Sequence, residues 1–389
     1  MENSNINILQ LCGYEADFPG SLIDHFIALE KFVRKNNSKL ILTFTAKKPW
    51  MVNLEKKGII VEIIPLKGLF DLDSFKKILK IIKKYNIIII HSHFGKNTVL
   101  FSVLIKLIFG GSIKIIRHWR STPNIILLEN IGARINFVKK IKKILGPIFW
   151  RIIYKFVDYN FVNARIIMKF IEENKIAKLN KVELLENSID LKRFDYNKVK
   201  SRRNKYNIDV NKVVIGSIVN FRLEKDILTL IKIPPLILDK HKDVIFVFAG
   251  DGPLRPELQE SVRKYVIQKK IIFTGYVSEM EQLIASCDII IISNHAVGIS
   301  NAHLEVMAMG KPIVTFNSGE LEFLVEDGVN GFLVNKGDIQ TFIERIEIMI
   351  KNKKLAENLG KNALKKIQKE YNIEKWAERV WNKYFEIVS

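Results

Sequence analysis

Short apolar runs alternate with longer amphipathic stretches along most of the chain. In the first half, runs rich in Ile and Val, such as NINILQLC, KLILTFTA and NIIIIHSHF, are separated by basic segments with helical spacing. Continuous apolar runs of this length are typical of parallel strands buried on both faces, and the amphipathic stretches are typical of the helices that connect them. The pattern therefore predicts an α/β fold built on a doubly wound parallel sheet.

A polar segment interrupts this alternation near the middle of the chain. Residues 196–211 are rich in Asn, Lys and Arg, and the alternation then resumes with VVIGSIVNF. We expect an N-terminal Rossmann-like domain over 1–195, a linker over 196–211 and a second Rossmann-like domain over 212–370, facing each other across a cleft because such sheets bind ligands at the carboxyl ends of their strands. Residues 371–389 are expected to form a helix that packs back on the N-terminal domain through one apolar face made of Trp376, Val380, Trp381 and Phe385.

Composition fits a folded protein with a strong attraction for anions. The 389 residues include 48% hydrophobic and 26% charged residues, and the net charge is +21. A charge of this sign attracts the phosphates of nucleotides, anionic lipids or nucleic acids, and does not by itself choose among them. No nucleic-acid-binding motif is present, so nucleic acid is not an expected partner and remains an alternative supported by charge alone.

Cysteine use and hydropathy bear on where the protein works. Cys12 and Cys287 are far apart and each lies within an apolar run, so neither a disulfide framework nor a thiolate metal site is expected. The first residues do not resemble a signal peptide, and no run of about 20 uncharged apolar residues occurs. We therefore expect a cytoplasmic protein that is neither exported nor membrane-spanning.

Polar groups at strand ends in the first half are candidates for chemistry. Gly20 opens a helix after the first strand, where backbone N–H groups could face an anion, although a plain capped helix is the alternative. His118 ends an apolar strand and could donate to a substrate hydroxyl, with an ordinary surface histidine as the alternative. His91 and His93 also end a strand, but no Cys, Asp or third His lies near them in the sequence, so no metal is expected there.

In the second half, two segments suit a phosphorylated ligand. Arg222 and Lys225 follow the strand in IGSIVNF and open a helix, where two cations can neutralise a diphosphate. The stretch Gly298, Ile299, Ser300 and Asn301 offers free backbone N–H groups at the start of another helix. Glu305 lies one turn into that helix, where its carboxylate could face hydroxyl groups of the same ligand.

Taken in order, these segments resemble the family 4 retaining glycosyltransferases of the GT-B architecture over nearly the whole chain. The resemblance rests on PGS, HSHFGKN, ENSIDLKRF, VNFRLEKD, AGDGPL, SNAHLEVMAMGKPIV and LVEDGVNGFLV, together with the strand-end His118. It implies transfer of a sugar from a nucleoside-diphosphate donor with retention of configuration, with no metal or other cofactor required. The donor would lie mainly on the C-terminal domain, and Gly20 would let the backbone approach its phosphates.

The resemblance also implies roles for the remaining candidates. Glu305 would bind the ribose hydroxyls, and the backbone N–H groups of 298–301 would bind the phosphates or the donor sugar. Arg222 with Lys225 would bind the diphosphate, and His118 would lie near the reaction centre.

Two departures from the family pattern affect the donor site. Val297 replaces the first Glu of the family's Glu-x7-Glu motif, and Asn220 stands where that family often has a phosphate-binding Arg, so that role is carried to Arg222. Losing one carboxylate removes about 1.5 to 3 kcal/mol of binding free energy, which weakens binding or changes sugar preference without abolishing turnover. We therefore expect an active enzyme with an altered donor preference. A pseudo-glycosyltransferase that binds nucleotides or partner chains is the main alternative, and an epimerase or phosphorylase of the same architecture is another.

The segment 134–155 combines seven Lys and Arg with Phe, Trp and Ile and contains no acidic residue. Such a stretch suits the anionic inner face of a cell membrane, although an ordinary helix pair packing inward is the alternative. We therefore expect peripheral membrane attachment and a glycan or lipid-linked acceptor of cell-envelope polysaccharide synthesis.

Overall fold

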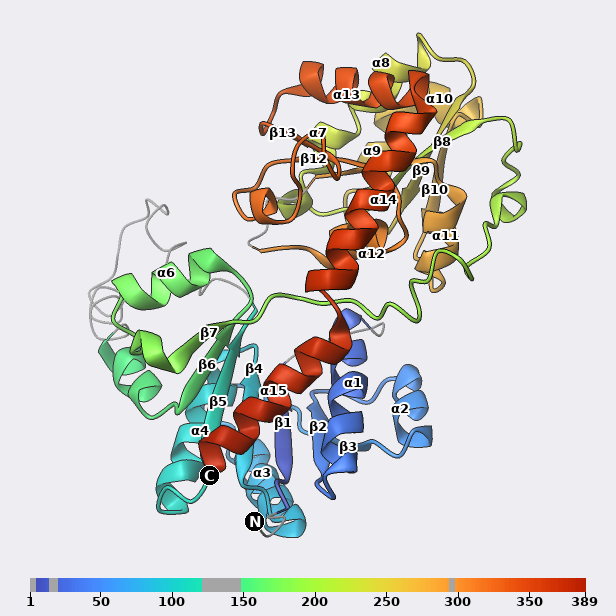
Figure 1. Ribbon diagram of the computed structural model, residues 1–389. Helices are drawn as coiled ribbons and strands as arrows, with labels where there is room; N and C mark the ends of the chain where they lie inside the picture. Colours follow the sequence, from blue (N-terminus) through green and yellow to red (C-terminus); the bar gives the residue numbers. More distant parts are fainter. Residues whose placement is uncertain (1–4, 14–19, 121–147, 294–297) are drawn as a thin grey trace, which may run out of the picture. The chain divides into compact units, whose positions relative to one another are not determined.

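The computed structural model of the protein describes residues 5–13, 20–120, 148–293 and 298–389. The chain divides into two compact units, and each unit contains one parallel sheet with helices on its faces (Figure 1). The first unit comprises Met1–Glu186 together with Ile373–Ser389, and the second comprises Asn187–Asn372. The predicted fold class, α/β with two doubly wound parallel sheets, is confirmed.

The first unit contains a seven-stranded sheet in the order β3-β2-β1-β4-β5-β6-β7. Its strands are β1 Ile8–Cys12, β2 Leu40–Phe44, β3 Ile60–Ile63, β4 Ile89–His93, β5 Lys114–Trp119, β6 Tyr159–Val162 and β7 Val182–Leu184. Its named helices are α1 Ser21–Lys35, α2 Val52–Lys56, α3 Leu72–Tyr85, α4 Lys96–Ile108, α6 Arg165–Glu173 and α15 Ile373–Val388, with short 3₁₀ turns η1 Pro49–Met51 and η3 Leu179–Lys181.

The second unit contains a six-stranded sheet in the order β10-β9-β8-β11-β12-β13. Its strands are β8 Val213–Ile218, β9 Val244–Ala249, β10 Ile271–Gly275, β11 Ile289–Ile292, β12 Ile313–Phe316 and β13 Phe332–Val334. Its helices are α7 Ile227–Leu230, α8 Ile233–Leu238, α9 Arg255–Ser261, α10 Arg263–Ile267, α11 Met280–Ser286, α12 Asn301–Ala308, α13 Ile339–Lys351 and α14 Lys353–Glu370, with 3₁₀ turns η4 Arg203–Tyr206, η5 Leu223–Lys225 and η6 Leu321–Phe323.

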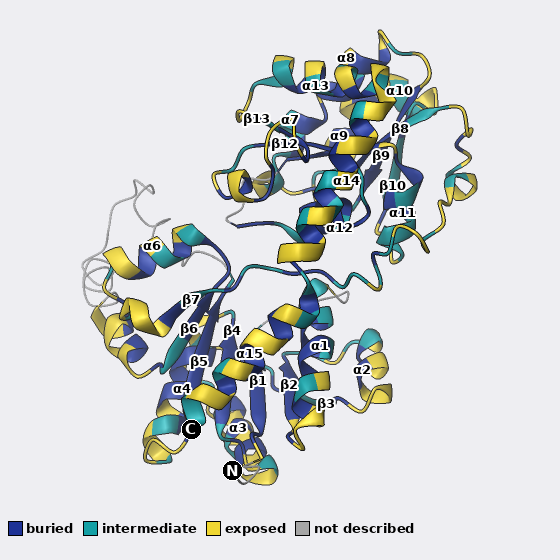
Figure 2. Cartoon of the chain, viewed as in Figure 1, coloured by how far each residue is buried: buried dark blue, intermediate teal, exposed yellow. Residues whose placement is uncertain are grey.

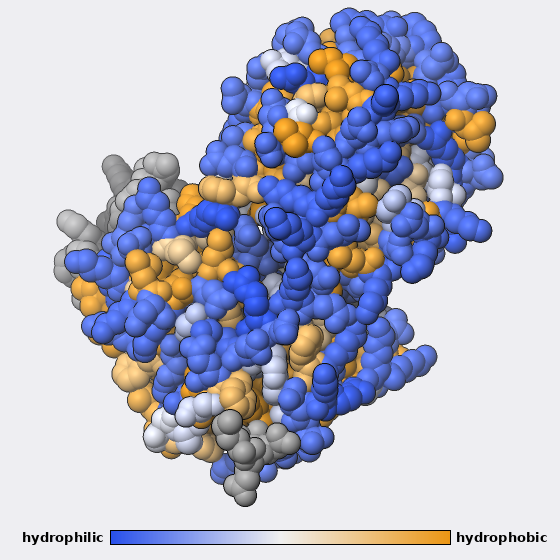
Figure 3. All heavy atoms as spheres, in the orientation of Figure 1, coloured by the Kyte–Doolittle hydropathy of each residue, from blue (hydrophilic) through white to orange (hydrophobic). Residues whose placement is uncertain are grey.

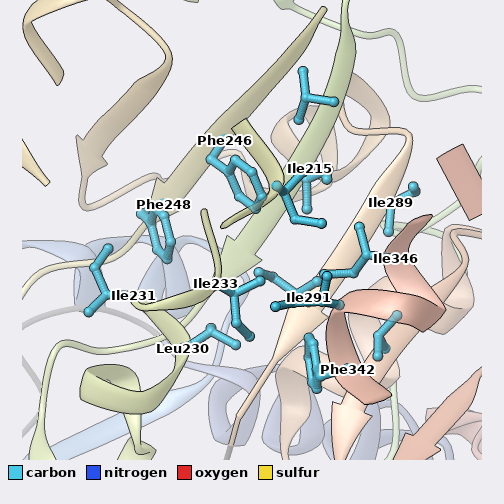
Figure 4. Packing of buried hydrophobic residues seen from close by; sticks show 14 of the residues in the cluster. Ile215, Leu230, Ile231, Ile233, Phe246, Phe248, Ile289, Ile291, Phe342 and Ile346 are labelled. Carbon is cyan, nitrogen blue, oxygen red and sulfur yellow. The ribbon is translucent and has the colours of Figure 1, made fainter. Parts of the chain in front are cut away.

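Both faces of the second sheet are buried. Successive residues of one strand fall into two different hydrophobic clusters, as Ile289 and Ile290 do, because side chains alternate between the faces of a sheet. On one face, Ile291 of β11 lies with Phe342 and Ile346 of α13 in a single cluster (Figure 4). The buried strands at the centre of each unit stand out in Figure 2. This double burial explains why the strands are continuous apolar runs in the sequence.

The boundaries of the two units differ from the expected ones. The chain leaves the first unit after Glu186, not at 195, and residues 187–211 belong to the second unit. Phe194 and Ile208 are buried in the core of that unit, and Arg203 Nη2 donates to Asp288 Oδ2 at 2.7 Å. The polar composition of 196–211 therefore reflects a surface segment held by a few buried anchors, which average composition does not reveal.

The C-terminal helix α15 belongs to the first unit, where it packs against α1. Trp376, Val380 and Trp381 are buried as the spacing predicted, but Phe385 is 50% exposed and the neighbouring Tyr384 is fully buried instead. The Tyr384 hydroxyl accepts a hydrogen bond from Gln10 Nε2 at 2.8 Å and lies 2.6 Å from His91 Nδ1. At the end of α15, the polar contact of Tyr384 with the sheet thus takes the place of the apolar contact expected of Phe385.

Replacing Tyr384 by Phe is expected to destabilise the first unit by about 1 to 3 kcal/mol, because Gln10 and His91 lose their buried partner. Calorimetric unfolding of full-length protein measures the effect. Tyr196→Phe is the control, since Tyr196 is 52% exposed and should tolerate the same change. Equal stability of the two variants would contradict the argument.

Candidate functional site

The loop after β8 is held in place by close backbone packing. A Cβ atom on Gly250 would lie 1.9 Å from Val219 O, and one on Gly252 would lie 2.5 Å from Phe221 O. Both glycines also have positive φ angles, of 140° and 157°. Side chains larger than hydrogen are therefore excluded from the AGDGPL turn, and this turn supports the backbone that carries Arg222.

Arg222 and Lys225 are the two cations of this loop. The Arg222 side chain is 62% exposed, and its Nη1 atom lies 4.0 Å from Glu224 Oε1, too far for a tight ion pair. Lys225 is partly buried, and that burial lowers the pKa of its ammonium group. Ser293, at the end of β11, donates its hydroxyl to Lys225 O at 2.7 Å. The loop is thereby fastened to the neighbouring strand.

The segment before α12 adopts the backbone expected of an open turn. Gly298 has a φ angle of 86°, in the left-handed region that favours glycine. Ile299 is buried and its carbonyl accepts from Asn187 Nδ2 at 3.0 Å, while Ser300 is the N-cap residue of α12. Glu305 is partly exposed one turn inside the helix. Val297, the altered position of the family motif, lies outside the described residues.

The two segments of the second unit lie at the same edge of its sheet. β8 and β11 are neighbours and parallel, so the loops that follow them leave from the same carboxyl edge. The two segments also interact electrostatically: burial, and then the charge of Lys225, lowers the pKa of His303 on α12. The structure therefore places the loop with Arg222 and Lys225 and the segment 298–305 at one carboxyl edge of the second sheet.

Gly20 lies in the first unit as the N-cap residue of α1. Its backbone has φ −98° and ψ 179°, an ordinary extended conformation, and a Cβ atom there would meet nothing within 4 Å. Residues 14–19 before it lie outside the described residues. No described neighbour therefore requires glycine at this position, whereas the close approach of a ligand would require it.

His118 is fully buried on β5, so the alternative of an ordinary surface histidine is wrong. It lies opposite His93 of β4 in the parallel register, and His91 lies two residues earlier on the same face of β4. The ring planes of His91 and His118 are stacked, with centroids 5.5 Å apart and 9° between the planes. Sequence reasoning missed this third histidine because it comes from a neighbouring strand, although β4 ends in His and β5 has His next to its last residue.

The buried histidine cluster of His91, His93 and His118 brings three candidate ligand nitrogens within 4.8 Å of one another, a grouping that could hold a metal ion. Burial is the main reason why the pKa of each ring lies well below its ordinary value, so the rings are neutral. Burial, and then the nearby charges of Arg117 and Arg120, hold the pKa of His91 well below its ordinary value, and the same positive surroundings disfavour a cation.

The basic stretch 134–155 is described only from residue 148 onward, where 148–155 form a helix. Ile148, Phe149 and Ile152 are 49%, 46% and 50% exposed, whereas Ile153 and Tyr154 are buried. Leu107 and Ile108 of α4 are also exposed, and Lys106 Nζ of the same helix donates to Phe156 O at 3.1 Å. Figure 3 shows apolar side chains at the surface of the first unit among hydrophilic ones. No helix in the described ranges is both long and apolar enough to cross a bilayer.

Comparisons with known proteins agree with this arrangement. Residues 198–366 match the family model of the glycosyl transferases group 1. N-acetyl-alpha-D-glucosaminyl L-malate synthase of Bacillus anthracis is 21% identical over 320 residues, which cover 82% of this chain and 80% of that protein. UDP-Gal:alpha-D-GlcNAc-diphosphoundecaprenol alpha-1,3-galactosyltransferase of Escherichia coli is 21% identical over 323 residues, with 82% and 80% covered.

A solved structure agrees over the whole fold. Anabaena Alr3699/HepE in complex with UDP-glucose has a TM-score of 0.77 at 18% identity, covering 98% of this chain and 100% of that one. Such low identity shows the fold alone, which is GT-B. The family match shows that residues 198–366 form a group 1 glycosyltransferase domain, family 4, and the two relatives and the two parallel sheets agree with a retaining glycosyltransferase.

Proposed function

We propose that this enzyme transfers a sugar from a nucleoside-diphosphate donor to a glycan or lipid-linked acceptor of cell-envelope polysaccharide synthesis. The observation that carries the proposal is the gathering of two cations, an open helix start and Glu305 at one edge of the second sheet. The Escherichia coli relative is named for a diphosphoundecaprenol acceptor, and the Anabaena structure contains UDP-glucose. The first name supports a lipid-linked acceptor for this chain, and the second supports a nucleoside-diphosphate-sugar donor.

We propose that each group of the donor site binds a different part of the donor. Arg222 can grip the diphosphate through two parallel N–H groups, and Lys225 can add a point charge beside it. The N–H groups at the start of α12 can stabilise the negative charge that grows on the leaving diphosphate. Glu305 can accept hydrogen bonds from the two ribose hydroxyls. We propose that no metal takes part, because the two cations can balance the charge of the diphosphate.

His118 and Gly20 are proposed to serve the reaction centre from the first unit. Neither ring nitrogen of His118 has a partner among the described residues. Burial holds the pKa of His118 well below its ordinary value, so the neutral ring can donate one hydrogen bond to a sugar hydroxyl without carrying charge. The ring is covered in this structure, and contact with a donor therefore requires the covering side chains to move.

Replacing Glu305 by Ala is expected to weaken nucleotide binding about 10- to 100-fold, the cost of losing hydrogen bonds to a charged group. Titration calorimetry with UDP, GDP and ADP measures the change. Glu357→Ala provides the control, because Glu357 is an exposed residue of another helix, α14. Unchanged affinity in the Glu305 variant would remove this residue from the site.

Val297 is expected to alter donor preference, because an apolar side chain tolerates a sugar that lacks a hydroxyl at that place. Val297→Glu should raise kcat/KM for common, fully hydroxylated donors and lower it for the native one. Steady-state rates across a donor panel measure both effects. Efficient wild-type turnover of a fully hydroxylated donor, improved further by Glu, would contradict this expectation. Nucleotide binding without turnover of any donor would favour the pseudo-glycosyltransferase alternative.

We further propose that the first unit attaches to an anionic membrane from its inner face. Between Lys96 and Val157 the only acidic residue is Glu129, against twelve Lys and Arg residues: Lys96, Lys106, Lys114, Arg117, Arg120, Arg134, Lys139, Lys140, Lys142, Lys143, Arg151 and Lys155. Exposed apolar residues of α4 and of 148–155 accompany these charges. Basic and apolar groups together suit the boundary between head groups and acyl chains.

The double variant Arg151→Glu with Lys155→Glu is expected to reduce sedimentation with phosphatidylglycerol vesicles at low salt, since both side chains are exposed and the two charge reversals repel the surface. Lys361→Glu with Lys365→Glu is the matched control, an exposed pair at the same spacing on α14 of the second unit. If wild-type protein stays in the supernatant at low salt, the attachment proposal fails.

A further inference from the structure

Ser300 occupies the N-cap position of α12 but does not cap the helix. An N-cap serine ordinarily accepts a hydrogen bond from the second or third backbone N–H of its helix. Here the Ser300 side chain makes no such bond. Its Oγ atom lies instead 2.6 Å from Nδ1 of His303, a fully buried residue of the first helical turn. The hydroxyl is thus directed toward the interior and away from the helix start.

His303 is fixed from its other side by the sheet. Its Nε2 atom lies 2.9 Å from Oγ1 of Thr315, which is fully buried on β12. Either neutral tautomer can bond both hydroxyls at once, because each hydroxyl can donate or accept. Burial, with a smaller effect from the charge of Lys225, lowers the pKa of His303 to about 3, so the ring is neutral at physiological pH. Ser300, His303 and Thr315 therefore form one buried hydrogen-bonded chain.

This chain leaves the start of α12 open. In the part of the chain that the structure describes, the backbone N–H groups of Asn301 and Ala302 have no partner, while that of His303 donates to Ser300 O at 3.2 Å. α12 has eight residues, and its first N–H groups carry the positive end of the helix dipole. A leucine at position 303 would free the Ser300 hydroxyl to turn and cap the N–H of Ala302, the second of the helix.

We propose that His303 is a positioning residue for the donor diphosphate: it holds the Ser300 hydroxyl in the interior, so that the N–H groups of Asn301 and Ala302 remain available to phosphate oxygens. The inference rests on the proposed donor site and adds a residue that touches no ligand itself. It also explains a buried histidine in a helix face that otherwise packs apolar residues, including Leu304, Val306 and Met307.

The test is a suppressor experiment on full-length enzyme. His303→Leu should weaken UDP binding about three- to tenfold, because a serine cap competes for the same N–H groups with the free energy of a typical cap. Ser300→Ala alone keeps the backbone N–H groups of 298–301 and removes only the hydroxyl, so it is the reference with which the double variant is compared. The double variant Ser300→Ala with His303→Leu should then recover affinity, since no hydroxyl is left to compete. Titration calorimetry with UDP, GDP and ADP gives the dissociation constants.

Two further variants separate positioning from stability. Thr315→Val breaks the far end of the chain without releasing Ser300, so it should lower the unfolding temperature and leave nucleotide affinity unchanged. His303→Gln can hydrogen-bond at both ends and should keep most of the affinity. Unchanged UDP affinity in His303→Leu would overturn the inference. So would a loss of affinity in His303→Leu that the double variant does not restore. Wild-type protein that binds none of the three nucleotides would instead overturn the proposed donor site, and the inference with it.

Discussion

The structure depends above all on burying both faces of two parallel sheets. A parallel strand that is covered on both sides needs apolar residues at every position, and its connection to the next parallel strand needs a helix. These two requirements account for the alternation of apolar runs and amphipathic segments along the chain. They also place every strand's carboxyl end at one edge of its sheet, so polar groups from distant parts of the sequence gather there.

The proposed donor site lies at this edge, where close backbone contacts hold its loops. Gly250 and Gly252 let one turn support the loop that carries Arg222, at distances that exclude any Cβ atom. Gly360 of α14 does the same for the end of α12, since its Cβ atom would lie 2.0 Å from Gly310 O. Loops fixed in this way hold cations and N–H groups in place before a ligand arrives, which is what electrostatic stabilisation of a leaving group requires.

The buried polar groups of the first unit depend on contacts between distant segments of the chain. His91, His93 and His118 lie under α15 in a region with buried arginines and, among the described residues, no carboxylate hydrogen-bonded to the rings. Burial keeps these rings neutral, and their hydrogen bonds to Tyr384 and Gln10 offset part of the cost of removing them from water. A chain segment far away in the sequence therefore satisfies part of this network, while both ring nitrogens of His118 and Nε2 of His91 have no partner among the described residues.

The sequence by itself determined the α/β class, the two parallel sheets and the family. It could do so because periodicity and ordered motifs are local properties, carried by residues that lie close together in the sequence. It did not determine the division of the chain at Glu186 and Asn372, because a single buried anchor such as Ile208 is invisible in an average over a polar segment.

Only the tertiary structure decided the contacts made across strands and between distant helices. The pairing of His118 with His93 depends on strand register, and the burial of Tyr384 in place of Phe385 depends on which face of α15 meets the sheet. The link from Ser300 through His303 to Thr315 depends on the packing of α12 against β12. Each is a matter of distance in space between residues, which sequence separation does not measure.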